Sequence, residues 1–363
     1  IDVSTQQPST IRTFDEAERW KRDLVLRSDV MAADHMKVDA PELTKLAAAG
    51  ITTVLATPPG VLFKGHSALV NVATPSESPI VGAIAPPRNG VAVVKSPVAL
   101  HVQFQAPRGD GYPAALLGAI AFVRQTFIDA EYQRAAEARF AKSPVGSLRP
   151  RFDGALDALY GTLGGSTGSA AREPVAFEAN LDREVVRALD MAKEFRLSPI
   201  ITGGHEADLT AADLKAANAR VIFSLNYPVR PKALAPDADE PARELRLRAH
   251  APKVPAGLQK AGVPFAFSSS GLTNASDFVK NAARAVKDGL APEAAIKALT
   301  LDAARIAGVA DRLGSLEKGK IANLIMTDGD LFADRTTVKL VLIDGQRVDL
   351  EAPELQRGRG RGQ

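Results

Sequence analysis

Histidine and carboxylate side chains are the groups with which this sequence would have to build a catalytic metal site, because its 363 residues include five histidines and no cysteine. The absence of cysteine excludes a thiolate nucleophile, a disulfide framework, an iron–sulfur cluster and a Cys-ligated zinc. The histidines are His35, His66, His101, His205 and His250. No two of them are separated by a single residue, so a His-x-His pair is absent.

Three short motifs could suggest other chemistry, but none has the context it needs. The serines at 268–270 lack a Gly-x-Ser-x-Gly elbow, and no His–acid pair can be assigned to them. Arg108, Gly109 and Asp110 match an integrin-binding tripeptide, which arises by chance in ordinary loops. The RGRGRG run at 357–362 could bind RNA or an acidic surface. It is more typical of a disordered, solubilising tail, and we expect no nucleic-acid partner.

Helices and strands alternate along most of the chain, and these elements would have to position any site. Asp39 caps a helix that ends at Gly50, and helices at 182–195 and 256–261 are each followed closely by an apolar run. This order, with short Gly or Pro turns, predicts parallel strands with helices outside, either as a (β/α)₈ barrel or as a doubly wound open sheet. Strands are expected at 51–56, 91–94, 98–104, 174–177, 199–202, 220–225 and 264–267.

Composition agrees with a large globular protein, since 45% of residues are hydrophobic and 24% are charged. The net charge of +3 is too small to indicate a nucleic-acid or a membrane partner. No apolar run approaches the roughly 18–20 residues of a spanning helix. A long helix is expected at 112–142, further helices between 274 and 307, and short strands at 322–327, 337–343 and 346–350. The chain therefore ends in a small β element.

The stretch from Gly289 to Val348 reads GLAPEAAIKALTLDAARIAGVADRLGSLEKGKIANLIMTDGDLF and then KLVLIDGQRV. It resembles the C-terminal part of amidohydrolase-superfamily enzymes, in particular the imidazolonepropionase-like group. Weaker similarity runs back to Lys45. The resemblance implies a TIM-like (β/α)₈ barrel, its first strand missing or supplied from elsewhere, and a small C-terminal β-sandwich portion. The expected regions are an N-terminal extended or helical segment (1–38), the barrel (39–310), the sandwich portion (311–351) and the Arg/Gly tail (352–363).

In the family, a divalent metal, usually zinc, lies at the barrel mouth. Its ligands are a His-x-His pair on the first strand, one His each on the fifth and sixth strands, and an Asp on the eighth. The metal lowers the pKa of its water to about 7, and the Asp takes the proton. In this chain the corresponding positions after the first strand are Glu178, Gly203 and Ser270. The resemblance therefore implies a degenerate metal site.

Four polar residues remain as candidates for a pocket at the mouth: Glu178, His205, Glu206 and Ser270. The first three could approach one another as a rebuilt three-ligand site, or they could be polar groups hydrogen-bonded to loops. Because a stranded charge is costly, Glu178 is expected to have a partner, either His205 or a nearby Arg, Lys or backbone amide. His66 and His101 have no companion at ligand spacing and are interpreted as structural.

Two functions follow from these observations. The first is a barrel that has lost its metal and acts as a non-catalytic binding or structural subunit of a larger assembly or homo-oligomer, with no cofactor. The alternative is a metal-dependent hydrolase of C–N bonds in cyclic amides or small peptides, using zinc or another divalent metal, whose His-x-His strand lies upstream of Ile1. Resemblance to exported family members favours a periplasmic or exported location over a cytoplasmic one.

Overall fold

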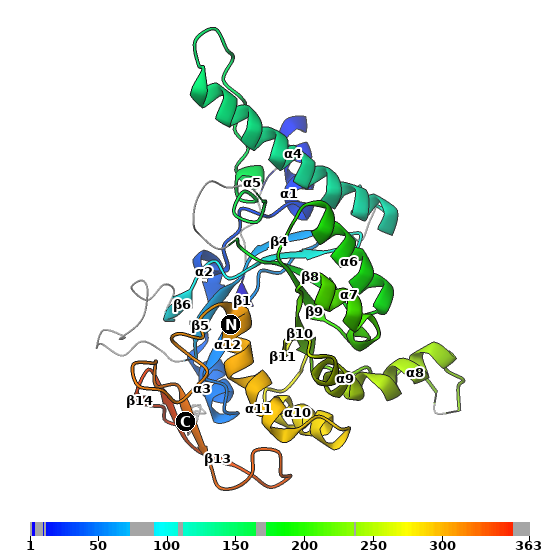
Figure 1. The fold of residues 1–363 in the computed structure, drawn as a ribbon, viewed down its shortest axis with the longest axis vertical. Helices are drawn as coiled ribbons and strands as arrows, with labels where there is room; N and C mark the ends of the chain where they lie inside the picture. Colours follow the sequence, from blue (N-terminus) through cyan, green and yellow to red (C-terminus); the bar gives the residue numbers. More distant parts are fainter. Residues whose placement is uncertain are drawn as a thin grey trace, which may run out of the picture.

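Five parallel strands and one antiparallel strand form the central sheet (Figure 1), in the order β11-β10-β9-β8-β7-β4. The computed structural model describes residues 2–3, 10, 12–72, 91–107, 112–164, 172–235 and 237–350. The parallel strands are β7 (Leu100–Gln103), β8 (Val175–Ala179), β9 (Pro199–Gly203), β10 (Arg220–Ser224) and β11 (Phe265–Ser268). The edge strand β4 (Phe63–His66) runs antiparallel to β7. The expected α/β architecture is confirmed in this part of the chain.

Two strands expected in the parallel sheet lie in another sheet. β3 (Thr53–Ala56) and β6 (Val93–Lys95) both pair antiparallel with β5 (Ala68–Asn71). The prediction that β3 and β6 belong to the barrel was wrong. It did not include β4 and β5, because the polar residues of β4 interrupt the apolar pattern of this stretch. The described strands are divided among separate sheets, and closure of an eight-stranded barrel is not seen among them.

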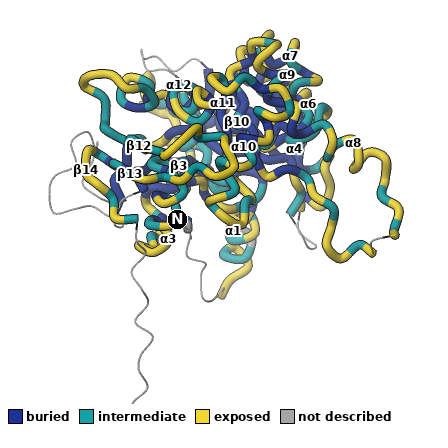
Figure 2. The backbone as a smooth tube through the Cα atoms, turned by 90° about the horizontal axis from the view of Figure 1, so that it is seen from below, coloured by how far each residue is buried: buried dark blue, intermediate teal, exposed yellow. Residues whose placement is uncertain are grey.

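Helices cover one face of the central sheet and bury a large aromatic core. These helices include α4 (Leu116–Lys142), α6 (Asp182–Glu194), α7 (Ala211–Ala216) and α9 (Val254–Ala261). Phe63, Phe127, Phe177 and Phe223 are among the largest fully buried side chains. Buried residues concentrate in the strands and in the helix faces against them (Figure 2), whereas α8 (Ala242–His250) has none. The C-terminal end of α4 and the loop after it project beyond the rest of the molecule (Figure 1).

The N-terminal segment lies along the free edge of β4. Leu26 and Met31 form parallel bridges with Phe63 and His66. Gly65 permits this approach, since a Cβ there would lie 2.4 Å from the carbonyl oxygen of Val30. The elements of this segment are β1 (Asp2–Val3), α1 (Phe14–Val25), α2 (Ala32–His35), β2 (Met36–Lys37) and α3 (Ala40–Ala48).

The C-terminal strands form a three-stranded antiparallel sheet that shares a core with β3, β5 and β6. Asn323 joins the two sheets, because its side-chain amide donates to Thr53 Oγ1 and Asn71 Oδ1, each at 2.8 Å. The elements after β11 are α10 (Asp277–Lys287), α11 (Pro292–Leu299), α12 (Leu301–Ala307), β12 (Leu324–Thr327), β13 (Val338–Ile343) and β14 (Gln346–Arg347). The short α5 (Gly154–Asp157) follows the projecting loop.

Some sequence-based expectations fall outside the described residues, namely the Arg-Gly-Asp tripeptide at 108–110 and the tail at 352–363. Among the helices that the structure describes, none combines the length and the apolar character needed to cross a bilayer.

Candidate functional site

The positions at which the resemblance implied metal ligands lie at the carboxyl edge of the parallel strands, where ligands usually bind in α/β folds. Glu178 lies on β8 opposite Thr202 of β9, and Ala179 lies opposite Gly203. Ser270 follows the end of β11 by two residues. The fold therefore brings Glu178, Gly203 and Ser270 to one end of the sheet, as the resemblance implied.

Glu178 has a cationic partner in the structure. Lys64 Nζ of β4 lies 2.5 Å from Glu178 Oε2, and the two side chains are 19% and 46% exposed, respectively. Lys64 reaches Glu178 across the intervening strand β7, because the sheet order places β7 between β4 and β8. The Glu178 carboxylate therefore pairs with an ammonium group, and this partner meets the expectation that Glu178 is not a stranded charge.

Gly203 is required by its backbone and its surroundings. Its φ is +99°, and a Cβ at this position would lie 2.4 Å from Asn180 Oδ1. A φ in this range is strained for residues with a Cβ, and the oxygen of Asn180 would have to move. The histidine that the resemblance implied here would therefore meet both backbone strain and the side chain of Asn180.

His205 and Glu206 follow β9 but have other partners. His205 is buried; its Nε2 lies 3.2 Å from the carbonyl oxygen of Ser224 on β10, and its ring packs edge-on against Phe223. Burial lowers the pKa of His205, which favours the neutral imidazole. Glu206 Oε2 accepts a hydrogen bond from the backbone N–H of Asp182 at 3.1 Å and so caps the first turn of α6. His205 thus contacts β10, and Glu206 contacts the start of α6.

The candidate residues do not converge on a common point. Glu178 contacts Lys64 on β4, whereas His205 contacts the backbone of β10. In the sheet order, β4 and β10 lie on opposite sides of the pair β8 and β9. Ser270 is exposed, and its backbone N–H donates to Ser268 Oγ at 3.0 Å. Within the described part of the chain, no three His, Cys, Asp or Glu side chains are grouped as a metal ion would need. The donors at the family positions do not fit a zinc site.

A set of polar residues that sequence reasoning did not assign to the mouth lies on the same face of the sheet as Glu178. Lys64 and His66 alternate along β4, and His101 and Gln103 alternate along the adjacent β7. This two-residue spacing on neighbouring strands was the signal that could have identified them. All four face away from the aromatic core, because Phe63 and Val102, which belong to that core, take the alternate positions.

The two histidines of this face are buried and incompletely hydrogen-bonded. His66 Nδ1 donates to Glu173 Oε1 at 2.6 Å, but the Nε2 atoms of His66 and His101 have no hydrogen-bond partner among the described residues. The pKa of His101 is lowered to about 3, chiefly by burial and further by the nearby Lys64 and His66. His101 is therefore neutral near pH 7, and it lies buried beside the charged pair of Lys64 and Glu178.

Comparisons with known proteins find a similar family and a similar fold. Residues 192–348 match the sequence model described as the amidohydrolase family. An amidohydrolase from Thermotoga maritima MSB8 has a similar structure, with a TM-score of 0.69 at 22% identity over 89% of this chain and 78% of that one. The matched residues include the segment from Gly289 to Val348, on which the predicted resemblance to the amidohydrolase superfamily rests. The chain shares the TIM-like fold type of that amidohydrolase over most of its length, whereas the narrower imidazolonepropionase-like resemblance stays a prediction.

Other solved structures are more distant. A prolidase complexed with N-methylphosphonate-L-proline has a TM-score of 0.43 at 20% identity, over 68% of this chain and 67% of that chain. A Xaa-Pro dipeptidase with methionine bound in its active site has a TM-score of 0.41 at 20% identity, over 56% of this chain and 50% of the dipeptidase. The chain thus spans half the length of that dipeptidase. No curated protein sequence matches the chain.

Proposed function

We propose that this chain is a non-catalytic member of the amidohydrolase superfamily that acts as a binding or structural subunit. The observation that carries the proposal is the local structure at Gly203, where a positive φ and the side chain of Asn180 leave no room for the family histidine. If only the metal-ligating side chain had been lost at this position, the space for that side chain would be expected to remain. Here the side-chain amide of Asn180 occupies that space.

The ion pair at Glu178 supports the same conclusion. A carboxylate can ligate zinc, but Glu178 Oε2 lies 2.5 Å from Lys64 Nζ, so a metal ion would have to compete with a positively charged side chain for the same oxygen. The hydroxyl of Ser270, at the family's Asp position, is a poor proton acceptor near neutral pH. Neither residue supplies what attack on an amide or lactam carbon needs, namely a held metal and a carboxylate that takes the proton.

Metal loading combined with a paired set of variants tests this proposal. The protein is incubated with Zn²⁺ or Mn²⁺, freed of unbound metal by gel filtration, and assayed for bound metal by mass spectrometry and for hydrolysis of lactams, hydantoins and dipeptides. Glu178→Gln removes the carboxylate at the mouth. Glu194→Gln is the control, because Glu194 is a half-exposed carboxylate on α6 that also pairs with a basic residue, Arg124, at 2.9 Å. We expect much less than one metal per chain and no metal-dependent turnover in any of the three proteins.

The alternative, a metal-dependent hydrolase of C–N bonds, makes the opposite prediction. One bound metal per chain, with turnover that Glu178→Gln abolishes and Glu194→Gln retains, would overturn the non-catalytic proposal. An assembly partner or a homo-oligomer, and a periplasmic or exported location, complete the proposal. Size-exclusion chromatography with light scattering and fractionation of the source cells test these two points separately from catalysis.

A further inference from the structure

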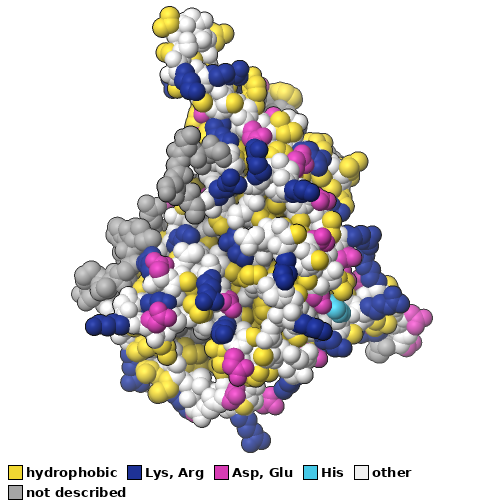
Figure 3. All heavy atoms as spheres, viewed as in Figure 1, with side chains coloured by type: hydrophobic (Ala, Val, Ile, Leu, Met, Phe, Trp, Pro, Cys, Tyr) yellow, Lys and Arg dark blue, Asp and Glu magenta, His cyan; other side chains and the backbone are white. Residues whose placement is uncertain are grey.

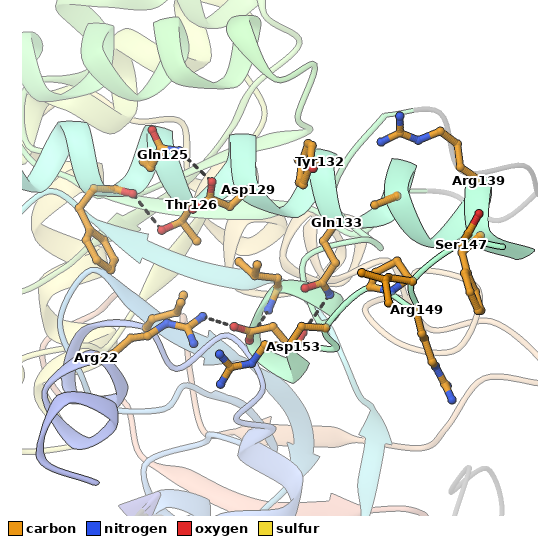
Figure 4. A pocket seen from close by; sticks show the side chains of 18 of the residues that line it. Arg22, Gln125, Thr126, Asp129, Tyr132, Gln133, Arg139, Ser147, Arg149 and Asp153 are labelled. Atoms are coloured by element: carbon orange, nitrogen blue, oxygen red, sulfur yellow. Dashed lines mark hydrogen bonds and ion pairs between the residues drawn. The ribbon is translucent and has the colours of Figure 1, made fainter. Parts of the chain in front are cut away.

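A long groove runs between helix α4 and the segment that follows it, on the projecting end of the molecule (Figure 4). Its volume is about 1000 Å³. One wall is a single stripe of α4, since the lining residues recur every three or four positions from Phe122 to Ser143. The other wall includes most of residues 147–153, and Arg22 and Leu26 also line the groove. It lies outside the barrel mouth and uses none of the family positions.

Positive charge dominates the lining. Its charged residues are Arg22, Arg139, Arg149, Arg151, Asp129 and Asp153. Arg22 pairs with Asp153 at 2.6 Å, and Asp129 accepts a hydrogen bond from Gln125. The other three arginines are exposed and form no ion pair with any residue that the structure describes. Basic side chains stand beside hydrophobic ones at this end of the molecule (Figure 3).

Large apolar side chains are exposed beside these arginines. Tyr132 is 68% exposed, Leu148 97% and Phe152 67%. A smaller cavity, lined in part by Phe140, Pro150 and Phe152, continues beside the groove. Exposed apolar side chains of this size that cluster along one groove are typical of an interaction site. The surface therefore combines unpaired positive charge with apolar contact area.

The segment after α4 also offers free backbone groups. No hydrogen bond to the backbone of residues 148–152 is formed within the described parts of the chain. Pro150 favours an extended conformation at Arg149, the residue before it. Free N–H and C=O groups on such a segment can pair with a second extended chain, as in the addition of a strand to a sheet edge.

We propose that this groove binds an extended acidic segment of a partner protein, with apolar side chains interspersed among its carboxylates. The stripe from Phe122 to Ser143 is about 32 Å long at a rise of about 1.5 Å per residue, which matches roughly ten residues of extended peptide. Carboxylates of that segment pair with Arg139, Arg149 and Arg151, and its apolar side chains cover Tyr132 and Leu148. The proposal does not depend on whether the barrel mouth is catalytic.

Selection from a displayed library of random twelve-residue peptides against the intact chain tests the proposal. Affinities of the selected peptides are then measured by fluorescence polarisation for three proteins. The test variant carries Arg139→Gln, Arg149→Gln and Arg151→Gln. The control variant carries Arg183→Gln, Arg243→Gln and Arg246→Gln, which removes the same charge from exposed arginines that also make no ion pair with described residues.

We expect the selected peptides to be rich in Asp, Glu and large apolar residues. Their binding should weaken by about 10- to 100-fold in the test variant and by less than about twofold in the control. Peptides without acidic enrichment, or equal weakening in both variants, would overturn the proposal. So would an arginine-dependent affinity for a 20-nucleotide single-stranded DNA that exceeds that of every selected peptide, or a change in oligomeric mass in the test variant, which would indicate that a second copy covers the groove.

Discussion

The two faces of the central sheet are built from the same strands but differ in character, because one carries a large aromatic core and the other carries charged and polar side chains beside a small apolar cluster that includes Ala176, Ile200 and Ala266. On the helix-covered face, Phe63, Phe177 and Phe223 are fully buried within one large apolar core. On the other face, Lys64, His101 and Glu178 occupy the alternate positions. Because successive residues of a strand point to opposite faces, each short segment contributes to both environments. The comparison indicates that the apolar face supplies most of the stability of the sheet and that the polar face makes this stability sensitive to pH.

The largest effect is expected from truncation on the apolar face. Phe223→Ala should lower the free energy of unfolding by about 3–5 kcal/mol, because it leaves a cavity among rings that include Phe267 and Tyr227. Urea unfolding followed by circular dichroism measures the change. Phe14→Ala is the control, since Phe14 is 77% exposed, and it should change the free energy by less than about 0.5 kcal/mol. Equal effects of the two substitutions would contradict the assignment of stability to this face.

On the polar face, His101 should make stability fall as the pH is lowered. Its pKa is about 3 in the folded protein, against the ordinary value of 6.5 for an accessible histidine. Between these values the unfolded chain binds more protons, so stability decreases as pH falls from 6.5, by at most about 1.4 kcal/mol per pH unit. His101→Gln should have a shallower dependence. Urea unfolding at several pH values from 7.5 to 4.5 compares the two proteins, and parallel curves would show that His101 is not the titrating group.

At the mouth, Gly203→Ala should destabilise the fold by about 2 kcal/mol, because it combines a strained φ with a clash against Asn180. Gly262→Ala separates these two causes, since Gly262 has a φ of +70° and nothing within 4 Å of a Cβ. That control should lose about 1 kcal/mol from backbone strain alone. Thermal unfolding measures both variants. If Gly203→Ala is the milder change, the argument that the mouth has no room for a ligand fails.

The smallest effect is expected at the ion pair of the mouth. Glu178→Gln should change the free energy of unfolding by less than about 1 kcal/mol, because the carboxylate is nearly half exposed and an amide can still accept a hydrogen bond from Lys64. Chemical unfolding at pH 7 checks this value. A loss comparable to that of Phe223→Ala would show that the two faces contribute equally, contrary to the comparison above.

The elements around β8 to β11 were predictable from sequence within a few residues. Caps, helical periodicity and short apolar runs depend on neighbours within a turn or two of chain, so α6 and β9 were expected close to their observed bounds. The strands β4 and β5 were missed, since Lys64, Gly65 and His66 interrupt the alternating pattern by which a half-buried strand is recognised. That error placed β3 and β6 in the wrong sheet.

The sequence by itself determined the similarity of its C-terminal part to the amidohydrolase family, the absence of a His-x-His pair and the absence of a side chain at Gly203, because these follow from residue identity alone. Tertiary structure decided that Gly203 lies against Asn180 and that Glu178 pairs with Lys64, 114 residues away. It also decided that the residues after α4 form a groove whose Arg139, Arg149 and Arg151 make no ion pair with described residues. The physical reason is that local signals act over a few residues, whereas a contact between distant side chains depends on strand order and packing, which no short stretch of the chain encodes.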